Sequence, residues 1–370
     1  MKEITENDVN YMKRALSLAL KGTGKVNPNP LVGAVIVKGG KVIGEGAHEY
    51  FGGPHAEVNA FKNALEDPMG ADLYVTLEPC SHHGKTPPCA DLIIEKKIKR
   101  VFIGTLDPNP LVSGSGVKKL EDAGIEVFHG ILTDECMSLN EVFMKYIVDK
   151  DPFILVKYAM SLDGKIATHT GDSKWITGEN ARFHSHSLRN KYMGIMVGIG
   201  TVFSDDPELT CRQEGGRDPI RIVADTHLRI PLDAKILDTS KAKTIIATGT
   251  LEDEKKAQKI RDMGAQILVC PDDNDKEKID LYSLFRTLGQ MGIDGIMIEG
   301  GGELLFSVME GGFADRVIAY MAPVLIGGRD AKTPLEGRGF SRIKDCIRLK
   351  DTVSISFNDG DFAVTGRVVR

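Results

Sequence analysis

Two stretches of the chain decide its fold. Residues 54–65 read PHAEVNAFKNAL and residues 73–89 read LYVTLEPCSHHGKTPPC. The first is a helix pattern that begins after a proline and carries a histidine and a glutamate in its opening turn. The second is a short apolar strand that runs into a cysteine, with another cysteine at the start of the next helix pattern. Strands and helices that alternate in this way are typical of a layered α/β domain.

His55, Cys80 and Cys89 form a candidate zinc site. One imidazole nitrogen and two thiolates are soft ligands, and zinc takes four, so one position is left for water. Zinc lowers the pKa of bound water toward neutrality, and Glu57 is placed to move the proton as a catalytic acid and base. We therefore predict hydrolytic zinc chemistry. The alternative interpretations are a structural zinc site that His82 or His83 completes, or two buried cysteines with an unrelated histidine.

Around these stretches the first half of the chain alternates helix and strand patterns. We predict helices over 8–20, 55–65, 88–97, 117–123 and 134–146, and strands over 31–37, 41–46, 73–77, 100–106 and 126–131. Helical crossovers imply that some of the strands pair in parallel. An Asp-Lys-Asp-Pro sequence interrupts the pattern within 148–152. We place the boundary between two domains there, with domains of residues 1–147 and 148–370.

A second α/β series starts at residue 153. The predicted strands are 153–159, 194–197, 220–224, 244–247, 266–269, 295–299 and 316–319, followed by a terminal hairpin of 353–357 and 362–369. Two glycine-containing turns, over 198–201 and 299–302, follow strands. The backbone amides of such a turn suit an anion, although neither turn fits the usual dinucleotide fingerprint. Two of them together favour a dinucleotide cofactor.

Composition and charge exclude several classes of protein. The 370 residues include 47 basic and 52 acidic side chains, for a formal net charge of −5. Nucleic-acid binding needs clustered cations, so we expect no nucleic-acid partner. The 6 cysteines are too few for a disulfide scaffold of this size. No segment resembles a membrane span or a signal peptide. We expect a cytoplasmic homo-oligomer with no membrane partner.

The zinc motif is part of a longer set of motifs. A His-x-Glu and Pro-Cys pattern is the signature of zinc nucleobase deaminases, although eight residues separate the two cysteines here where those enzymes have two. Further motifs are NPNP at 27–30, DPNP at 107–110, KYAMSLDGK at 157–165, WIT at 175–177 and EGGG at 299–302. With them, the whole chain resembles the bifunctional riboflavin-biosynthesis deaminase-reductases. This resemblance implies an α/β protein with a cytidine-deaminase-like three-layer N-terminal domain and a dihydrofolate-reductase-like C-terminal domain.

The resemblance also implies two consecutive reactions on a small pyrimidine nucleotide. The first is zinc-dependent deamination of 2,5-diamino-6-ribosylamino-4(3H)-pyrimidinone 5′-phosphate, and the second is reduction of the ribosyl group to ribityl by NADPH. The implied substrate contacts are Asn29, His48, His82, Lys85, Asp107 and Asn109 in the deaminase, and Ser173, Arg189, Leu209, Arg212 and Glu299 in the reductase. The implied cofactor contacts are Met160, Trp175, Thr201, Asp205, Thr226, Gly301, Gly302, Glu303, Leu304, Leu305, Phe306 and Ser307.

Two assignments leave alternatives open. Lys157, which we expect at the end of its strand, is our candidate for the catalytic group that polarises or protonates the sugar oxygen. The alternative is a solvated lysine without a catalytic role. For the whole chain, the alternative is a nucleic-acid deaminase, such as one acting on transfer RNA, with a C-terminal domain that only senses nucleotides.

Overall fold

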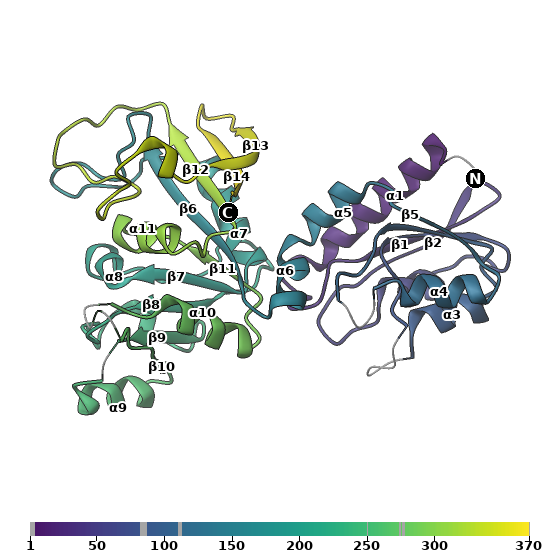
Figure 1. Ribbon diagram of the computed structural model, residues 1–370, viewed down its shortest axis with the longest axis horizontal. Helices are drawn as coiled ribbons and strands as arrows, with labels where there is room; N and C mark the ends of the chain where they lie inside the picture. The colour runs from purple at the N-terminus through teal and green to yellow at the C-terminus, as the bar shows by residue number, and fades with distance from the viewer. Residues whose placement is uncertain are drawn as a thin grey trace. The chain divides into compact units, whose positions relative to one another are not determined.

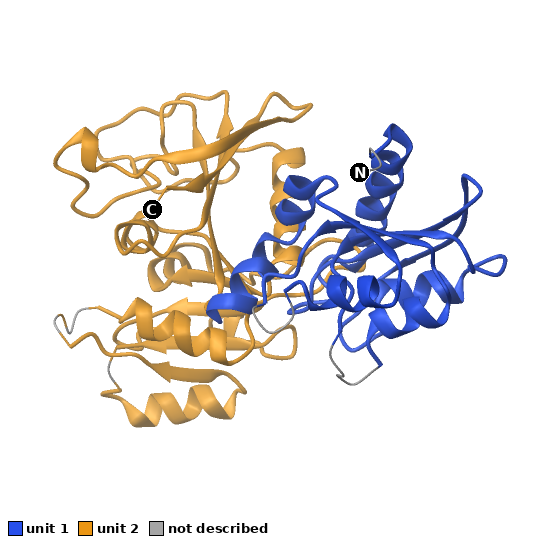
Figure 2. Cartoon of the chain, turned by 45° about the vertical axis from the view of Figure 1, so that its right-hand side comes forward, with its two compact units in different colours: residues 1–150 blue, residues 151–370 orange. Residues whose placement is uncertain are grey.

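The computed structural model of the chain describes residues 4–81, 87–109, 113–249, 251–273, 275 and 278–369. The chain divides into two compact units, residues Met1–Lys150 and Asp151–Arg370 (Figure 2). Each unit is built on a single β-sheet (Figure 1). Among the described residues, no helix is both long enough and apolar enough to cross a membrane.

Unit 1 contains a five-stranded sheet in the order β2-β1-β3-β4-β5. Strand β1 is antiparallel to β2 and β3, whereas β3, β4 and β5 are parallel, as the helical crossovers predicted. The strands are β1 (Gly33–Lys38), β2 (Lys41–Ala47), β3 (Asp72–Leu77), β4 (Arg100–Thr105) and β5 (Glu126–His129). The helices are α1 (Glu6–Ala19), η1 (Leu20–Gly22), α2 (Ala56–Lys62), α3 (Cys89–Glu95), α4 (Ser115–Asp122), α5 (Thr133–Leu139) and α6 (Glu141–Asp149).

Helices cover both faces of this sheet, because side chains that alternate along a strand point to opposite faces. Ile36 of β1 belongs to a buried cluster that includes residues of α2, α3 and α4. Its neighbour Val35 belongs to a second cluster with Met12 of α1 and Cys136 of α5. Figure 1 shows α1 and α5 on one side of the strands and α3 and α4 on the other. Unit 1 is therefore the three-layer domain that the sequence predicted.

The helix predicted over 134–146 is wrong, because the structure has two helices, α5 and α6, that meet at Asn140. The amide of Asn140 holds the backbone of Leu31: its Oδ1 accepts from the Leu31 N–H at 2.8 Å, and its Nδ2 donates to the Leu31 carbonyl at 2.9 Å. Asn140 is 3% exposed and has φ −107° and ψ 20°. The apolar periodicity continues through this residue, so only its distant partner reveals the break.

Asn140→Ala should lower the free energy of unfolding by about 2 kcal/mol, because it removes two part-buried hydrogen bonds worth about 1 kcal/mol each. Urea denaturation followed by circular dichroism measures this change. Asn63→Ala is the matched control. Asn63 is exposed, and its side chain donates one hydrogen bond within the described part of the chain, to the carbonyl of Glu45 at 2.9 Å. Equal destabilisation by the two variants would show that the Leu31 contact has no special weight.

Unit 2 contains a nine-stranded sheet in the order β10-β9-β8-β7-β11-β6-β12-β14-β13. In this order across the sheet, each strand from β10 through β12 pairs in parallel with its neighbour. The predicted terminal hairpin of β13 and β14 forms an antiparallel edge. The strands are β6 (Phe153–Ser161), β7 (Gly194–Gly198), β8 (Ile220–Ala224), β9 (Thr244–Thr248), β10 (Gln266–Val269), β11 (Gly295–Ile298), β12 (Arg316–Ala322), β13 (Leu349–Ser356) and β14 (Phe362–Val368). The helices are α7 (Glu179–Lys191), α8 (Ile199–Asp205), η2 (Lys235–Leu237), α9 (Glu254–Asp262), α10 (Leu281–Gln290), α11 (Gly302–Glu310) and η3 (Ile343–Asp345).

The strand order of unit 2 reverses at β11. The chain runs outward from β7 to β10 and then returns to insert β11 between β7 and β6. Such a reversal leaves a crevice beyond the carboxyl ends of the parallel strands, where ligands bind in open α/β sheets. The two glycine-containing turns meet there, since the Gly301 N–H donates to the Thr201 hydroxyl at 3.2 Å. Gly300 has φ +104°, and a Cβ on it would lie 2.4 Å from that hydroxyl oxygen, so only glycine fits.

Candidate active sites

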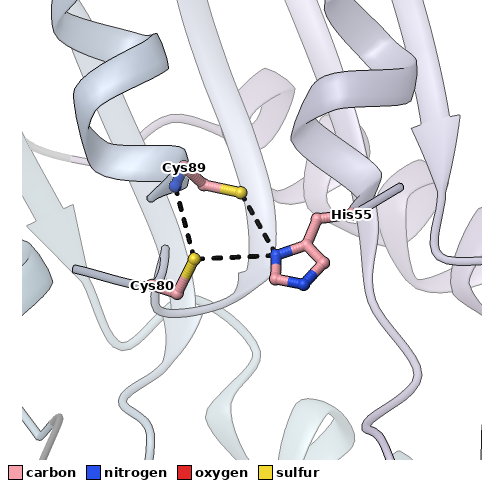
Figure 3. Close-up of side chains that lie close together, drawn as sticks. All are labelled: His55, Cys80 and Cys89. Carbon is pink, nitrogen blue, oxygen red and sulfur yellow. Dashed lines mark hydrogen bonds between the residues drawn. The ribbon is translucent and has the colours of Figure 1, made fainter. Parts of the chain in front are cut away.

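The three predicted metal ligands converge in unit 1 (Figure 3). His55 lies directly before α2, Cys80 follows β3, and Cys89 begins α3. The His55 Nδ1 atom is 3.6 Å from the Cys80 Sγ and 3.3 Å from the Cys89 Sγ. In a tetrahedral zinc site with ordinary bond lengths, a nitrogen and a sulfur ligand are about 3.6 Å apart. The donor atoms and their spacing therefore fit a zinc ion.

The surroundings of Cys80 favour its thiolate. A hydrogen bond with the Cys89 thiol, together with His55, lowers the pKa of Cys80 well below its usual value, although burial opposes this change. The Cys89 backbone N–H also donates to the Cys80 sulfur at 3.3 Å. A thiolate, rather than a thiol, is the form that binds a metal.

Glu57 lies in the first turn of α2 and is 3% exposed. Burial raises the pKa of its carboxyl, although the charge of His55 opposes the change. Interactions with the side chains of His55, Cys80 and Cys89 place Glu57 at the three ligands. A carboxyl buried at the metal ligands is placed to take up and release a proton there, which is the role that the sequence predicted for Glu57.

The implied substrate residue His48 lies beside His55, and the implied residue Asn29 contacts His48. The rings of His48 and His55 meet edge to face with their centroids 5.6 Å apart. His48 Nδ1 lies 3.0 Å from the Pro54 carbonyl, which can only accept, so Nδ1 carries the proton. His48 Nε2 then accepts from Asn29 Nδ2 at 3.2 Å. Burial lowers the pKa of His48, in keeping with a neutral ring that contacts the metal ligand His55 and accepts a hydrogen bond from Asn29.

The implied substrate residues Asp107 and Asn109 follow β4. The Asn109 N–H donates to Asp107 Oδ1 at 2.9 Å, and the Asp107 N–H donates to Glu78 Oε2 at 3.2 Å. Glu78 was not among the predicted site residues, although a carboxylate at the end of an apolar strand, directly before Pro79-Cys80, is an unusual feature that could have drawn attention to it. The implied contacts His82 and Lys85 lie outside the described residues.

In unit 2 a cavity of about 120 Å³ collects cationic and aromatic side chains. Its lining includes Lys157, Arg182, Arg189, His186, Trp175 and Tyr320. Trp175 is 65% exposed, and the Arg182 guanidinium lies over its ring, 4.7 Å from the centroid. An anionic ligand is the natural occupant of such a cavity.

Glu299 joins two of these cations. Arg189 Nη2 lies 2.9 Å from Glu299 Oε2, and Lys157 Nζ lies 3.6 Å from Glu299 Oε1. Burial alone would raise the pKa of Glu299, but the charges of Arg189 and Lys157 lower it to about 2. Glu299 is therefore ionised throughout the neutral range and holds both cations in place.

The expected position of Lys157 at the end of a strand is wrong. Strand β6 continues to Ser161, because its last residues pair with Met321 and Ala322 of β12. Lys157 therefore lies in the middle of the strand, and its side chain is only 15% exposed. This position also argues against a solvated lysine.

His186 was missed by the sequence-based prediction. Burial, together with the charges of Arg189 and Arg212, lowers the pKa of His186 to about 4, so its ring is neutral at working pH. The atoms His186 Nδ1, Arg189 Nε and Glu299 Oε1 are buried and have no hydrogen-bond partner within the described part of the chain. Because buried polar atoms are normally paired, three such atoms together indicate a polar ligand. The three-residue spacing of His186 and Arg189 on a helix was the available signal.

Apart from Trp175, which lines the cavity, the implied cofactor residues lie at or after the carboxyl ends of neighbouring strands. Met160 lies near the end of β6, Thr226 shortly after β8, and Thr201 and Asp205 in α8, which follows β7. Gly301 and Gly302 begin α11, and Glu303, Leu304, Leu305, Phe306 and Ser307 follow within it. Leu305 and Phe306 are core residues. Of the remaining implied substrate contacts, Leu209 is buried, Ser173 is half-buried and Arg212 is exposed.

Two family models match the chain. Residues 5–105 match the cytidine and deoxycytidylate deaminase zinc-binding region, and residues 152–360 match the RibD C-terminal domain. Together with the zinc-type ligand set of unit 1, these matches define an enzyme with a zinc-binding deaminase domain and a reductase domain.

Relatives along the whole chain place it more narrowly. The riboflavin biosynthesis protein RibD of Actinobacillus pleuropneumoniae is 50% identical over 347 residues, covering 94% of this chain and 92% of that protein. The crystal structure of a diaminohydroxyphosphoribosylaminopyrimidine deaminase/5-amino-6-(5-phosphoribosylamino)uracil reductase from Thermotoga maritima is 40% identical, with a TM-score of 0.84 and coverage of 98% and 99%. Acinetobacter baumannii RibD is 36% identical, with a TM-score of 0.87 and coverage of 99% of both chains. The chain belongs to the RibD family of bifunctional deaminase-reductases of riboflavin biosynthesis, which confirms the predicted family and fold classes. These relatives give no support to a nucleic-acid deaminase.

Proposed function

We propose that unit 1 hydrolytically deaminates 2,5-diamino-6-ribosylamino-4(3H)-pyrimidinone 5′-phosphate and that unit 2 reduces the ribosyl group of the product with NADPH. The observation that carries this proposal is the pairing of two separate sites: a three-ligand zinc set beside a buried Glu57, and a cationic cavity near a strand-end crevice. The Thermotoga maritima relative is named for a deaminase and a reductase acting on compounds of this class.

In the deaminase, His55, Cys80 and Cys89 would hold zinc, which supplies hydroxide from water at neutral pH. Glu57 takes the first proton of the attacking water and gives it to the ring nitrogen, and it then carries the second proton, from the hydroxyl added to the ring carbon, to the departing amine. Asn29 and His48 orient the pyrimidine beside His55. The predicted role of Lys85, with His82 beside it, is to meet the phosphate as a point charge.

In the reductase, bound NADPH supplies a hydride to C1′ of the substrate. Backbone amides at the turn before α11 suit the phosphates of the cofactor, with Thr201 fixing this turn. Arg189 and Arg212 bind the 5′-phosphate of the substrate, and Lys157 protonates the sugar oxygen as its bond to C1′ breaks. His186, neutral and with an unpartnered Nδ1, offers one further hydrogen bond to the substrate.

Removal of the metal should separate the two activities. Protein stripped with a chelator should release no ammonia from the diamino nucleotide, yet should still oxidise NADPH when given the deaminated intermediate. Mass spectrometry of the products, with and without chelator and NADPH, measures both steps. Zinc should restore ammonia release. Ammonia release by metal-free protein would contradict zinc hydrolysis, and deamination of RNA but not of the nucleotide would contradict the proposed substrate.

A further inference from the structure

Glu78 is a buried carboxylate that the proposed chemistry does not use. It follows β3 and precedes Pro79 and the metal ligand Cys80, and it is 4% exposed. Its Oε2 accepts from the backbone N–H groups of Asp107 at 3.2 Å and Gly114 at 3.0 Å. Its Oε1 accepts from those of Gly116 at 2.9 Å and Val117 at 3.3 Å.

The backbone comes unusually close to Glu78 at the start of α4. A Cβ on Gly116 would lie 2.2 Å from the Pro79 carbonyl oxygen and 3.1 Å from Glu78 Oε1, so only glycine fits there. The Glu78 N–H also donates to the Thr105 carbonyl at 3.0 Å, which joins the ends of β3 and β4. The segment that carries Cys80 and the start of α4 are thus in direct backbone contact.

The chemistry of these bonds argues against a proton-transfer or metal-ligand role for Glu78. A carboxylate has about four lone-pair positions, and four backbone N–H groups occupy them here. Three of these groups belong to the start of α4, where a negative charge is also favoured by the helix dipole. What distinguishes Glu78 from an ordinary helix cap is the fourth group, which belongs to Asp107, an implied substrate contact.

We propose that Glu78 is a positioning residue of the deaminase, which sets the distance between the metal ligand Cys80 and the substrate segment Asp107–Asn109. Asp107 in turn accepts from the Asn109 N–H at 2.9 Å, so Glu78 orders Asp107 directly and Asn109 through Asp107. The inference rests on the proposed function, since Asp107 and Asn109 matter to catalysis when unit 1 binds the pyrimidine nucleotide.

Glu78→Gln tests this role because it changes one oxygen into an amide nitrogen of nearly the same size. The glutamine side chain keeps one acceptor oxygen, but its NH2 group replaces the other oxygen and faces two backbone N–H donors, which then lose their acceptor. Glu78→Asp keeps the charge and both acceptors on a shorter side chain, so it should recover part of the lost function. Glu121→Gln, an exposed position on the same helix α4, is the matched control.

The expected result is a fall of about 10- to 100-fold in kcat/KM for ammonia release by Glu78→Gln, carried mainly by KM. Glu78→Asp should lie between this variant and the wild type, and Glu121→Gln should match the wild type. Zinc content and reduction of supplied intermediate should stay unchanged, which shows that the chain is folded. Hydrogen exchange should become faster at the amides of Asp107, Gly114, Gly116 and Val117.

Three outcomes would overturn the role. Faster exchange with an unchanged KM would make Glu78 a purely structural helix cap. Loss of zinc from Glu78→Gln would mean that Glu78 acts on the metal ligands. Unchanged exchange would show that the hydrogen bonds of Glu78 do not order these amides. The proposed function is tested separately by the wild-type protein. If the wild type does not deaminate the diamino nucleotide, that function fails, whereas the exchange result for Glu78→Gln still reports on the contact itself.

Discussion

Glu57→Gln should abolish ammonia release while zinc content and the reduction of supplied intermediate remain at the wild-type level. The carboxyl of Glu57 is buried at the three metal ligands, where it can reach both water and substrate. His48 is the nearest alternative, but its Nδ1–H is engaged by the Pro54 carbonyl and burial lowers its pKa. General acid–base catalysis contributes about 10²- to 10⁴-fold, and because the proposed mechanism routes every proton transfer through Glu57, we expect a loss of about 10⁴-fold.

The measurement is ammonia release, with zinc content from elemental analysis and NADPH oxidation from absorbance on the same sample. Glu49→Gln, an exposed position of unit 1, is the matched control and should keep both activities. Residual deamination within tenfold of the wild type would remove Glu57 from its role. Loss of reduction along with deamination would contradict two independent active sites.

The zinc ligands could be predicted from the sequence because their chemistry is rare and each lies next to a recognisable element boundary. His55 precedes a helix, Cys80 follows an apolar strand and Cys89 starts a helix, and the structure brings all three together. The strands of unit 2 were predicted for a related reason. Parallel strands inside a sheet are buried on both faces and read as short apolar runs, so the predicted strand 220–224 coincides with β8 and the predicted strand 244–247 lies within β9.

What could not be predicted depends on contacts distant in the sequence. Asn140 ends a helix because it binds Leu31, and Glu78 gathers amides from residues 29 to 39 positions further along the chain. The pairing of β6 with β12 makes Lys157 a mid-strand residue. Local propensity carries no information about such partners. The resemblance assigned a role neither to His186 nor to Glu78, although Glu78 stands directly before Pro79-Cys80 in the motif, because the contacts of both residues depend on the folded structure.

Arg189→Ala should lower the reductase kcat/KM by about 100-fold or more and leave deamination unchanged. Arg189 binds the Thr210 carbonyl through Nη1 at 3.0 Å and Glu299 through Nη2 at 2.9 Å. Truncation removes a guanidinium suited to a phosphate and leaves the buried Glu299 with Lys157 alone at 3.6 Å. Breaking one partner of a buried charge pair costs about 3 kcal/mol, which is roughly a hundredfold in an equilibrium constant.

The pH profile distinguishes lost phosphate binding from the loss of the ion pair. In the wild type the pKa of Glu299 is about 2, below its usual value, so the carboxylate stays ionised and contributes no inflection near neutral pH. Removing Arg189 raises this pKa, since burial then outweighs the single remaining cation. Reduction by Arg189→Ala should therefore fall as the pH is lowered, where the wild type is flat.

Arg189→Lys keeps the charge but loses the planar fork, so it should restore the flat profile while KM stays high. An Arg189→Ala profile as flat as that of the wild type would show that Arg189 does not control the charge of Glu299, and loss of deamination in this variant would contradict separate sites.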